Sequence, residues 1–188
     1  MKQKELKQIG MSVVLSLIVG PWASAADFTL TSPQLTPGGK MQQEQLFKGF
    51  GCNGENISPE LHWQGEPSGT RSFALTMYDP DAPTGSGWWH WIVFNIPAER
   101  HKLEKNSGGA SPTSKNRVGI QSRTDFGSTG YGGACPPAGH GAHRYQFRIW
   151  ALDTPHLELD DQASGAMVGY FLNQHALAQA ELTVSYGR

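Results

Sequence analysis

Two short segments combine histidine with proline, glycine and acidic side chains, a composition suited to a polar ligand pocket. The first, residues 79–90, begins Asp-Pro-Asp-Ala-Pro and ends at His90. The second, residues 132–145, contains a Pro-Pro pair and leads to His143. Imidazole N–H groups and the backbone amides of glycine-bearing loops donate hydrogen bonds to anions, and prolines stiffen loop walls. The two segments together predict a shared anion pocket, although either histidine alone would be typical of a hydrogen-bonded core residue.

A carboxylate in such a pocket needs a separate role, because it would repel an anion. Asp79 continues the alternating row formed by Phe73, Leu75 and Met77. The role that suits it is to orient an imidazole and to favour the protonated ring. Its side chain could also cap the Asp-Pro turn, and the two roles are compatible.

Alternating apolar and polar residues predict the strands that must carry these segments. The expected strands are residues 28–31, 73–79, 90–96, 143–150 and 181–186. A helix is expected over residues 164–178, where Met167, Tyr170, Phe171 and Ala178 recur at helical spacing. The polar stretch 100–121 indicates a surface loop. Because strands predominate and only one helix is strong, the pattern favours a β-sandwich with helical additions.

The two-residue period of a strand also predicts where each histidine points. His90 would share a face with the even-numbered residues up to Ile96, and His143 with the odd-numbered residues up to Ile149. Both imidazoles would then lead apolar rows and point toward the core end of the sandwich.

Residues 1–25 are predicted to be a cleaved signal peptide. Three lysines precede a short apolar run, and Ala23-Ser-Ala25 has the small residues that a signal peptidase recognises. The domain expected over residues 26–188 then carries 12 basic side chains (15 minus 3) and 15 acidic ones (16 minus 1), a net charge of −3. That balance argues against nucleic acid as the main partner, and the apolar run is too short to span a bilayer.

Cys52 and Cys135 are the two cysteines of the chain. An even number in an exported protein favours a disulfide, and two free thiols are the alternative. Since Cys135 directly precedes the Pro-Pro pair, a bridge would tie the pocket wall to a neighbouring loop. We hypothesise that it pre-organises the anion site.

Motifs of several large enzyme classes are absent, as are cofactor-binding motifs. The sequence has no G-x-S-x-G, H-E-x-x-H, P-loop or C-x-x-C motif. A hydrolase using His90 and His143 as acid and base remains an alternative, without a recognisable nucleophile. A metal held by these histidines with Asp79 and His140 is a weaker one, because loop spacing does not impose a common direction on His140.

The order of these motifs resembles the phosphatidylethanolamine-binding protein family. The resemblance covers residues 28–186 and rests on the segments 79–83 and 136–145, with Trp88 and His90 between them. Residues 52–59 and 164–169 are similar to its bacterial branch, which is labelled Raf kinase inhibitor-like. Trp89 stands where animal relatives have another histidine, and Cys135 where they have glycine. A signal peptide would also separate the chain from cytosolic kinases.

The resemblance implies an antiparallel β-sandwich with a few peripheral helices and a compact pocket for phosphate-like groups. Carried over by motif position, the ligand-binding residues would be Asp79, Pro83, Trp88, His90, Gly133, Pro136, Pro137, His143 and Tyr145. We therefore expect a periplasmic or secreted binding protein for a small anion, which could modulate a protein partner.

Overall fold

The computed structural model describes residues 27–109 and 118–188. The predicted signal segment lies outside these residues, as does part of the predicted surface loop. Within the described ranges, no helix is long and apolar enough to cross a membrane.

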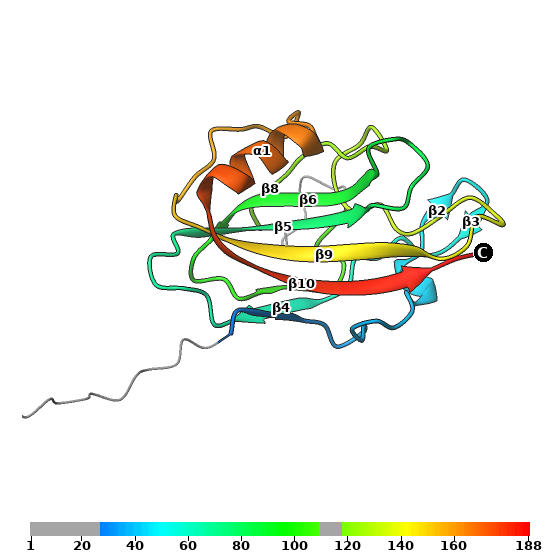
Figure 1. Cartoon of the computed structure of the whole chain (residues 1–188), viewed down its shortest axis with the longest axis horizontal. Helices are drawn as coiled ribbons and strands as arrows, with labels where there is room; N and C mark the ends of the chain where they lie inside the picture. Colours follow the sequence, from blue (N-terminus) through cyan, green and yellow to red (C-terminus); the bar gives the residue numbers. More distant parts are fainter. Residues whose placement is uncertain (1–26, 110–117) are drawn as a thin grey trace, which may run out of the picture.

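Strands make up most of the regular structure, and all paired strands run antiparallel (Figure 1). They are β1 (Thr29–Thr31), β2 (Lys48–Gly49), β3 (Cys52–Asn53), β4 (Leu61–Gln64), β5 (Ser72–Asp79), β6 (Trp88–Pro97), β7 (Lys102–Leu103), β8 (Ile120–Gln121), β9 (His143–Leu152) and β10 (Ala176–Tyr186). The central sheet has the order β10-β9-β5-β6-β8, and a smaller sheet has the order β1-β4-β7. Strands β2 and β3 form a separate pair near the end of β10. The five strands expected from the sequence are all present, and the mainly β, sandwich-like fold is confirmed.

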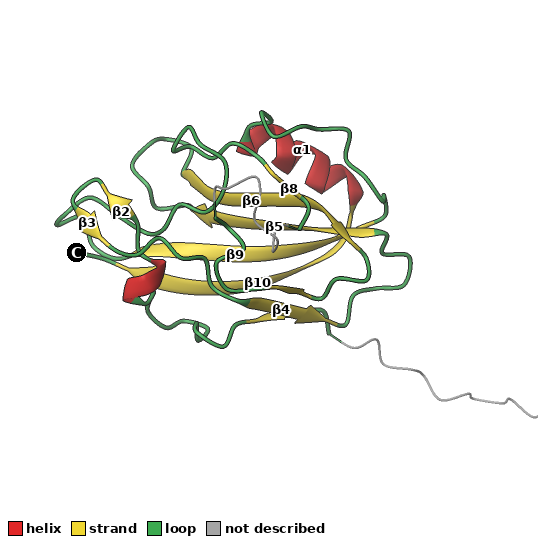
Figure 2. Cartoon of the chain, turned by 180° about the vertical axis from the view of Figure 1, so that it is seen from behind, coloured by secondary structure: helices red, strands yellow, loops and turns green. Residues whose placement is uncertain are grey.

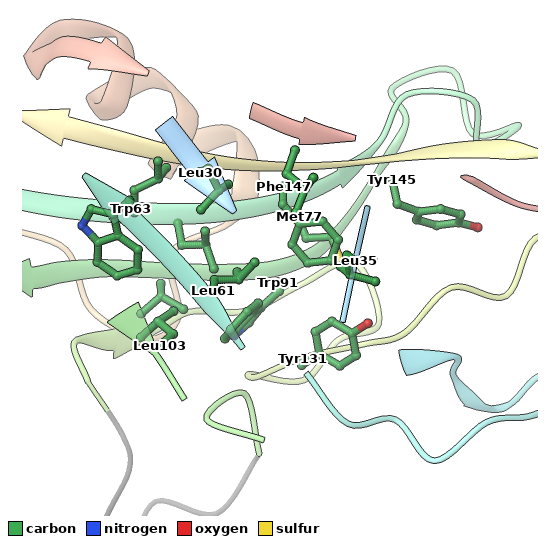
Figure 3. Packing of buried hydrophobic residues seen from close by; sticks show 14 of the residues in the cluster. Leu30, Leu35, Leu61, Trp63, Met77, Trp91, Leu103, Tyr131, Tyr145 and Phe147 are labelled. Carbon is green, nitrogen blue, oxygen red and sulfur yellow. The ribbon is translucent and has the colours of Figure 1, made fainter. Parts of the chain in front are cut away.

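The central sheet is covered on both faces, which explains why β5 and β6 are almost continuously apolar. Against the small sheet it buries the main core, in which Leu61 and Trp63 pack with Phe73, Met77 and Phe147 (Figure 3). Its other face packs against helix α1 (Gly165–His175), which lies across β6 and β8 in Figure 2. Figure 3 shows Tyr145 at one end of the main core, which is the end that matters for the site.

Helix α1 is shorter than the sequence predicted and turns a partly different face to the sheet. It begins after Ser164, whose side chain accepts a hydrogen bond from the Met167 N–H at 3.2 Å, and it ends before β10. Val168 and Leu172 are its buried apolar side chains, whereas Met167 and Tyr170 are 49% and 60% exposed. Phe171 of the predicted row packs partly against the same core. The helix approaches the sheet closely at Gly165, where any side chain would overlap the Trp89 indole.

Both histidines point toward the core as predicted, but Ile92 and Phe94 of β6 do not share the face of His90. In β6, Trp89 pairs with Tyr78 and Trp91 pairs with Met77, so His90 is an additional residue in the strand. Such a β-bulge moves the following side chains to the opposite face. Ile92 therefore packs toward the helix, while His90 itself faces Tyr145 in the main core.

Candidate functional site

A cavity of about 200 Å³ lies where β5, β6 and β9 meet their loops. Of the nine predicted site residues, it brings together eight: Asp79, Pro83, Trp88, His90, Pro136, Pro137, His143 and Tyr145. Gly133 is not among the lining residues, and its N–H donates to Asn56 Oδ1 at 2.7 Å. Cys135 also lines the cavity, at the wall where the sequence placed it, together with residues that the sequence did not single out: Phe50, Ala82, Thr84 and Phe126.

Asp79 ends β5, where its carboxylate orients the His143 ring and caps the Asp-Pro turn. Its Oδ2 accepts a hydrogen bond from His143 Nδ1 at 2.7 Å, and its Oδ1 accepts from the Asp81 N–H at 2.8 Å. Asp79 and His143 are only 3% and 2% exposed. A buried carboxylate is costly unless it is paired and hydrogen-bonded, so the pairing fixes the direction of the His143 ring.

The Asp-Pro loop is held against β9 by a second ion pair. Arg144 donates to Asp81 from its side chain at 2.9 and 2.7 Å, and its backbone N–H donates to the same carboxylate at 2.9 Å. These hydrogen bonds lower the pKa of Asp81 to about 2. Asp81 therefore faces Arg144 rather than the cavity, and it serves to position the loop.

His90 reaches the cavity through the β6 bulge, and its ring is held by one backbone contact. Its Nδ1 lies 2.8 Å from the Gly132 carbonyl oxygen. Because a carbonyl can only accept, Nδ1 carries the proton and Nε2 is the free ring nitrogen. Burial lowers the pKa of His90 to about 4, against the opposing effect of the nearby backbone and of the Asp79 carboxylate. The ring is thus neutral near pH 7, and its Nε2 presents a lone pair.

Two further lining residues carry buried donors without a hydrogen-bond partner in the described residues. These atoms are Trp88 Nε1 and Tyr145 Oη. Burial raises the pKa of Tyr145, so its hydroxyl stays protonated. An unpaired buried donor costs about 1–3 kcal/mol, and native structures seldom leave one unexplained. A ligand oxygen in the cavity would pair with such donors.

The contact between His140 and His143 was not predicted from the sequence. His140 Nδ1 lies 2.8 Å from His143 Nε2, which extends the Asp79–His143 pair outward by one more ring. The loop spacing alone gave no reason for the two rings to face each other. Gly141, with φ of 91°, turns the backbone between them into the left-handed region and makes the contact possible. Within the described residues, no group of three or more acidic, histidine or cysteine side chains is placed to hold a metal ion.

The predicted disulfide is present and borders the cavity. Cys52 and Cys135 are joined across a sequence separation of 83 residues. Cys135 lines the cavity, and Cys52 lies in β3, next to the β2–β3 turn that carries Phe50. The bridge therefore connects two walls of the cavity.

Comparison with known proteins agrees with this fold. The family model described as phosphatidylethanolamine-binding protein matches residues 31–187. The chain belongs to this family. Among curated relatives, the UPF0098 protein YbcL of Escherichia coli is 49% identical over 181 residues, covering 96% of this chain and 98% of that protein. The UPF0098 protein YbhB of the same organism is 48% identical over 157 residues, covering 84% and 98%.

Solved structures of relatives share the fold. A crystal structure of Escherichia coli YbcL, described as a new member of the mammalian PEBP family, superposes with a TM-score of 0.84 at 50% identity. It covers 87% of this chain and 99% of its own. The homologue CT736 from Chlamydia trachomatis has a TM-score of 0.72 at 27% identity, covering 88% and 99%.

Proposed function

We propose that this chain is an exported binding protein that holds a phosphate-type anion in the cavity between the Asp-Pro loop and the Pro-Pro wall. The observation that carries the proposal is the pair of buried donors without partners, Trp88 Nε1 and Tyr145 Oη, beside an imidazole that a carboxylate holds in place. An oxyanion has several acceptor oxygens close together, so one group could pair with both donors.

The state of His90 refines which form of the anion fits. Its Nε2 presents a lone pair, which would repel a fully ionised oxygen and accept a hydrogen bond from a protonated one. A monoprotonated phosphate, free or as an ester, supplies both kinds of oxygen. The proposed ligand is therefore a phosphate group that keeps one proton, or whose arrival protonates His90.

Binding is better supported than hydrolysis by His90 and His143. Acid–base catalysis of ester cleavage needs a nucleophile or a positioned water within reach of the base. Among the lining residues, the Cys135 sulfur is held in the disulfide, burial keeps the Tyr145 hydroxyl protonated, and the Thr84 hydroxyl donates to the Gly87 carbonyl. These features support a binding site rather than an acyl- or phosphoryl-transfer centre.

Export forms the second part of the proposal. It is supported by the signal-like sequence of residues 1–25, with cleavage after Ala25, and by the Cys52–Cys135 bridge. Disulfides persist in the periplasm and outside the cell, where glutathione and thioredoxin do not reduce them. The protein would then meet its ligand in the periplasm or in the medium.

The test is a two-dimensional NMR titration of the oxidised chain from residue 26 onward with phosphate and with phosphoethanolamine. We expect saturable shifts of the His90 and His143 imidazole signals, because both rings line the cavity. His143→Ala and His143→Gln should each weaken binding at least tenfold while the dispersed spectrum of a folded protein is retained. His175→Ala is the matched control, because His175 forms an exposed pair with Asp153, at 2.8 Å.

Equal affinity in the His143 variants and in the control would contradict the assignment of the pocket. Silence of both imidazoles up to millimolar ligand would contradict anion binding altogether, and it would move the function to a protein-contact surface.

A further inference from the structure

Aromatic rings form a continuous path from the buried end of the cavity to its mouth. The Phe126 ring lies 5.3 Å from His90 and 5.4 Å from Trp88, measured between ring centroids. On its other side it lies 6.0 Å from Phe50, and Phe47 packs against both phenylalanine rings at 4.5 and 5.3 Å. One wall of the cavity is therefore aromatic from His90 and Trp88 outward to Phe126 and Phe50.

Phe50 stands at the outer end of this wall, where its contacts with Phe47 and Phe126 leave most of the ring exposed. It lines the cavity, yet it is 70% exposed, more than any other large hydrophobic residue of the described chain. Its backbone has φ of 52°, in the left-handed region that bulky side chains rarely adopt. The flanking Gly49 and Gly51 also have positive φ, so the turn displays one ring to solvent. Strained residues of this kind concentrate at ligand sites.

Two separate links hold the Phe50 turn against the opposite wall. The disulfide joins Cys52 to Cys135, and the Arg188 side chain spans the same gap. Arg188 donates from Nε to the Pro136 carbonyl at 2.7 Å, and from its two terminal nitrogens to the Gly51 and Phe50 carbonyls, each at 3.1 Å. A turn that only presented a ring to water would not need two crosslinks to the site.

We infer that Phe50 is the specificity-determining residue for an apolar group attached to the bound anion, and that Arg188 positions it. The inference rests on the proposed function, since it assigns the part of the ligand that extends from the anion toward the mouth. The ligand class is a phosphate monoester that bears one compact flat group, such as an aromatic ring. A cavity of about 200 Å³ suits a phosphate group with one ring, and it is too small for two acyl chains. A lipid could therefore offer only its headgroup to the site, and we take a soluble ester as the source, which the vesicle experiment below distinguishes from a membrane lipid.

The test compares inorganic phosphate with phenyl phosphate by isothermal titration calorimetry on the oxidised chain from residue 26 onward. Wild type should bind phenyl phosphate about fivefold more tightly than phosphate, as expected for a stacked aromatic pair. Phe50→Ala should abolish this preference while phosphate affinity stays within about twofold, and Phe50→Tyr should retain the preference. Tyr170→Ala is the matched control, because Tyr170 is an exposed aromatic residue on α1, on the other face of the central sheet.

Arg188→Ala tests the positioning role by the same ratio. It should reduce the affinity for phenyl phosphate by a larger factor than the affinity for phosphate, and Arg188→Lys should restore part of the preference. Equal binding of the two ligands by wild type, or an unchanged ratio in Phe50→Ala, would overturn the inference and leave the proposed function standing. If wild type bound neither phosphate nor phenyl phosphate, the proposed function would be overturned instead. Cosedimentation with phosphatidic acid vesicles, if it depended on Phe50, would overturn the choice of a soluble ester.

Discussion

Acid should destabilise this protein through His90, and the size of the effect follows from its burial. The ordinary pKa of histidine, 6.5, applies in the unfolded chain, whereas burial lowers the pKa of folded His90 to about 4. Between these values the unfolded state binds a proton that the folded state excludes, so the free energy of unfolding rises with pH. The contribution of neutral His90 to the free energy of unfolding is fully present above pH 6.5 and is lost as the pH falls toward 4. The cost is about 2 kcal/mol at pH 5 and about 3 kcal/mol at pH 4.

Urea unfolding of wild type and of His90→Gln at pH 4, 5, 6 and 7.5 measures this effect. Glutamine can still donate a hydrogen bond to the Gly132 carbonyl, and it does not titrate. The difference in unfolding free energy between the two proteins should shift by about 3 kcal/mol in favour of the variant between pH 7.5 and pH 4. Contributions from the rest of the chain are common to both proteins and cancel in this difference. Parallel pH profiles would refute the claim that His90 is buried as the neutral ring.

Two further changes test the fold around the site. Gly165→Ala should lower the free energy of unfolding by about 1–3 kcal/mol, because its methyl group would overlap the Trp89 indole. In Gly169→Ala the new methyl group would meet the same ring at an ordinary 3.7 Å, so the free energy of unfolding should rise by up to ~1 kcal/mol. Urea titrations of the two variants decide this, and equal effects would refute the close approach of helix and sheet. Replacing Cys52 and Cys135 by serine should cost at most about 4.5 kcal/mol by the loop-entropy account and should weaken phosphate binding in calorimetry. Unchanged phosphate affinity would show that the bridge does not organise the site.

The positions of the central strands could be predicted from the sequence, because residues 143–150 alternate clearly and residues 90–96 form a nearly continuous apolar run. In β9, odd-numbered residues from His143 to Ile149 face the main core, as the alternation required. The two-residue period assigned side chains to the wrong face where a β-bulge interrupts the strand. The β6 bulge at His90 leaves no mark in a strand that is apolar on both faces, so parity could not place Ile92 or Phe94.

The polar half of the cavity was predictable, and the aromatic half was not. Asp79, His90 and His143 stand at the ends of strands beside proline loops, and strand ends of one sheet gather at one edge. Phe50 and Phe126 come from loops distant in sequence, and only tertiary contacts bring them to the cavity. A phenylalanine between two glycines was the one local signal for Phe50, because such a turn can expose a ring.

The loops that form the cavity have few ladder hydrogen bonds to each other, so their relative position depends on a small number of crosslinks. The Asp-Pro loop is fixed by Asp79 to His143 and by Asp81 to Arg144. The opposite wall is fixed by the disulfide and by Arg188. Each link is made before any ligand arrives, so binding would order few additional groups, and little of the interaction energy would be lost to ordering. A small cavity with two unpaired donors can therefore bind an anion without carrying net positive charge, because its geometry is already set.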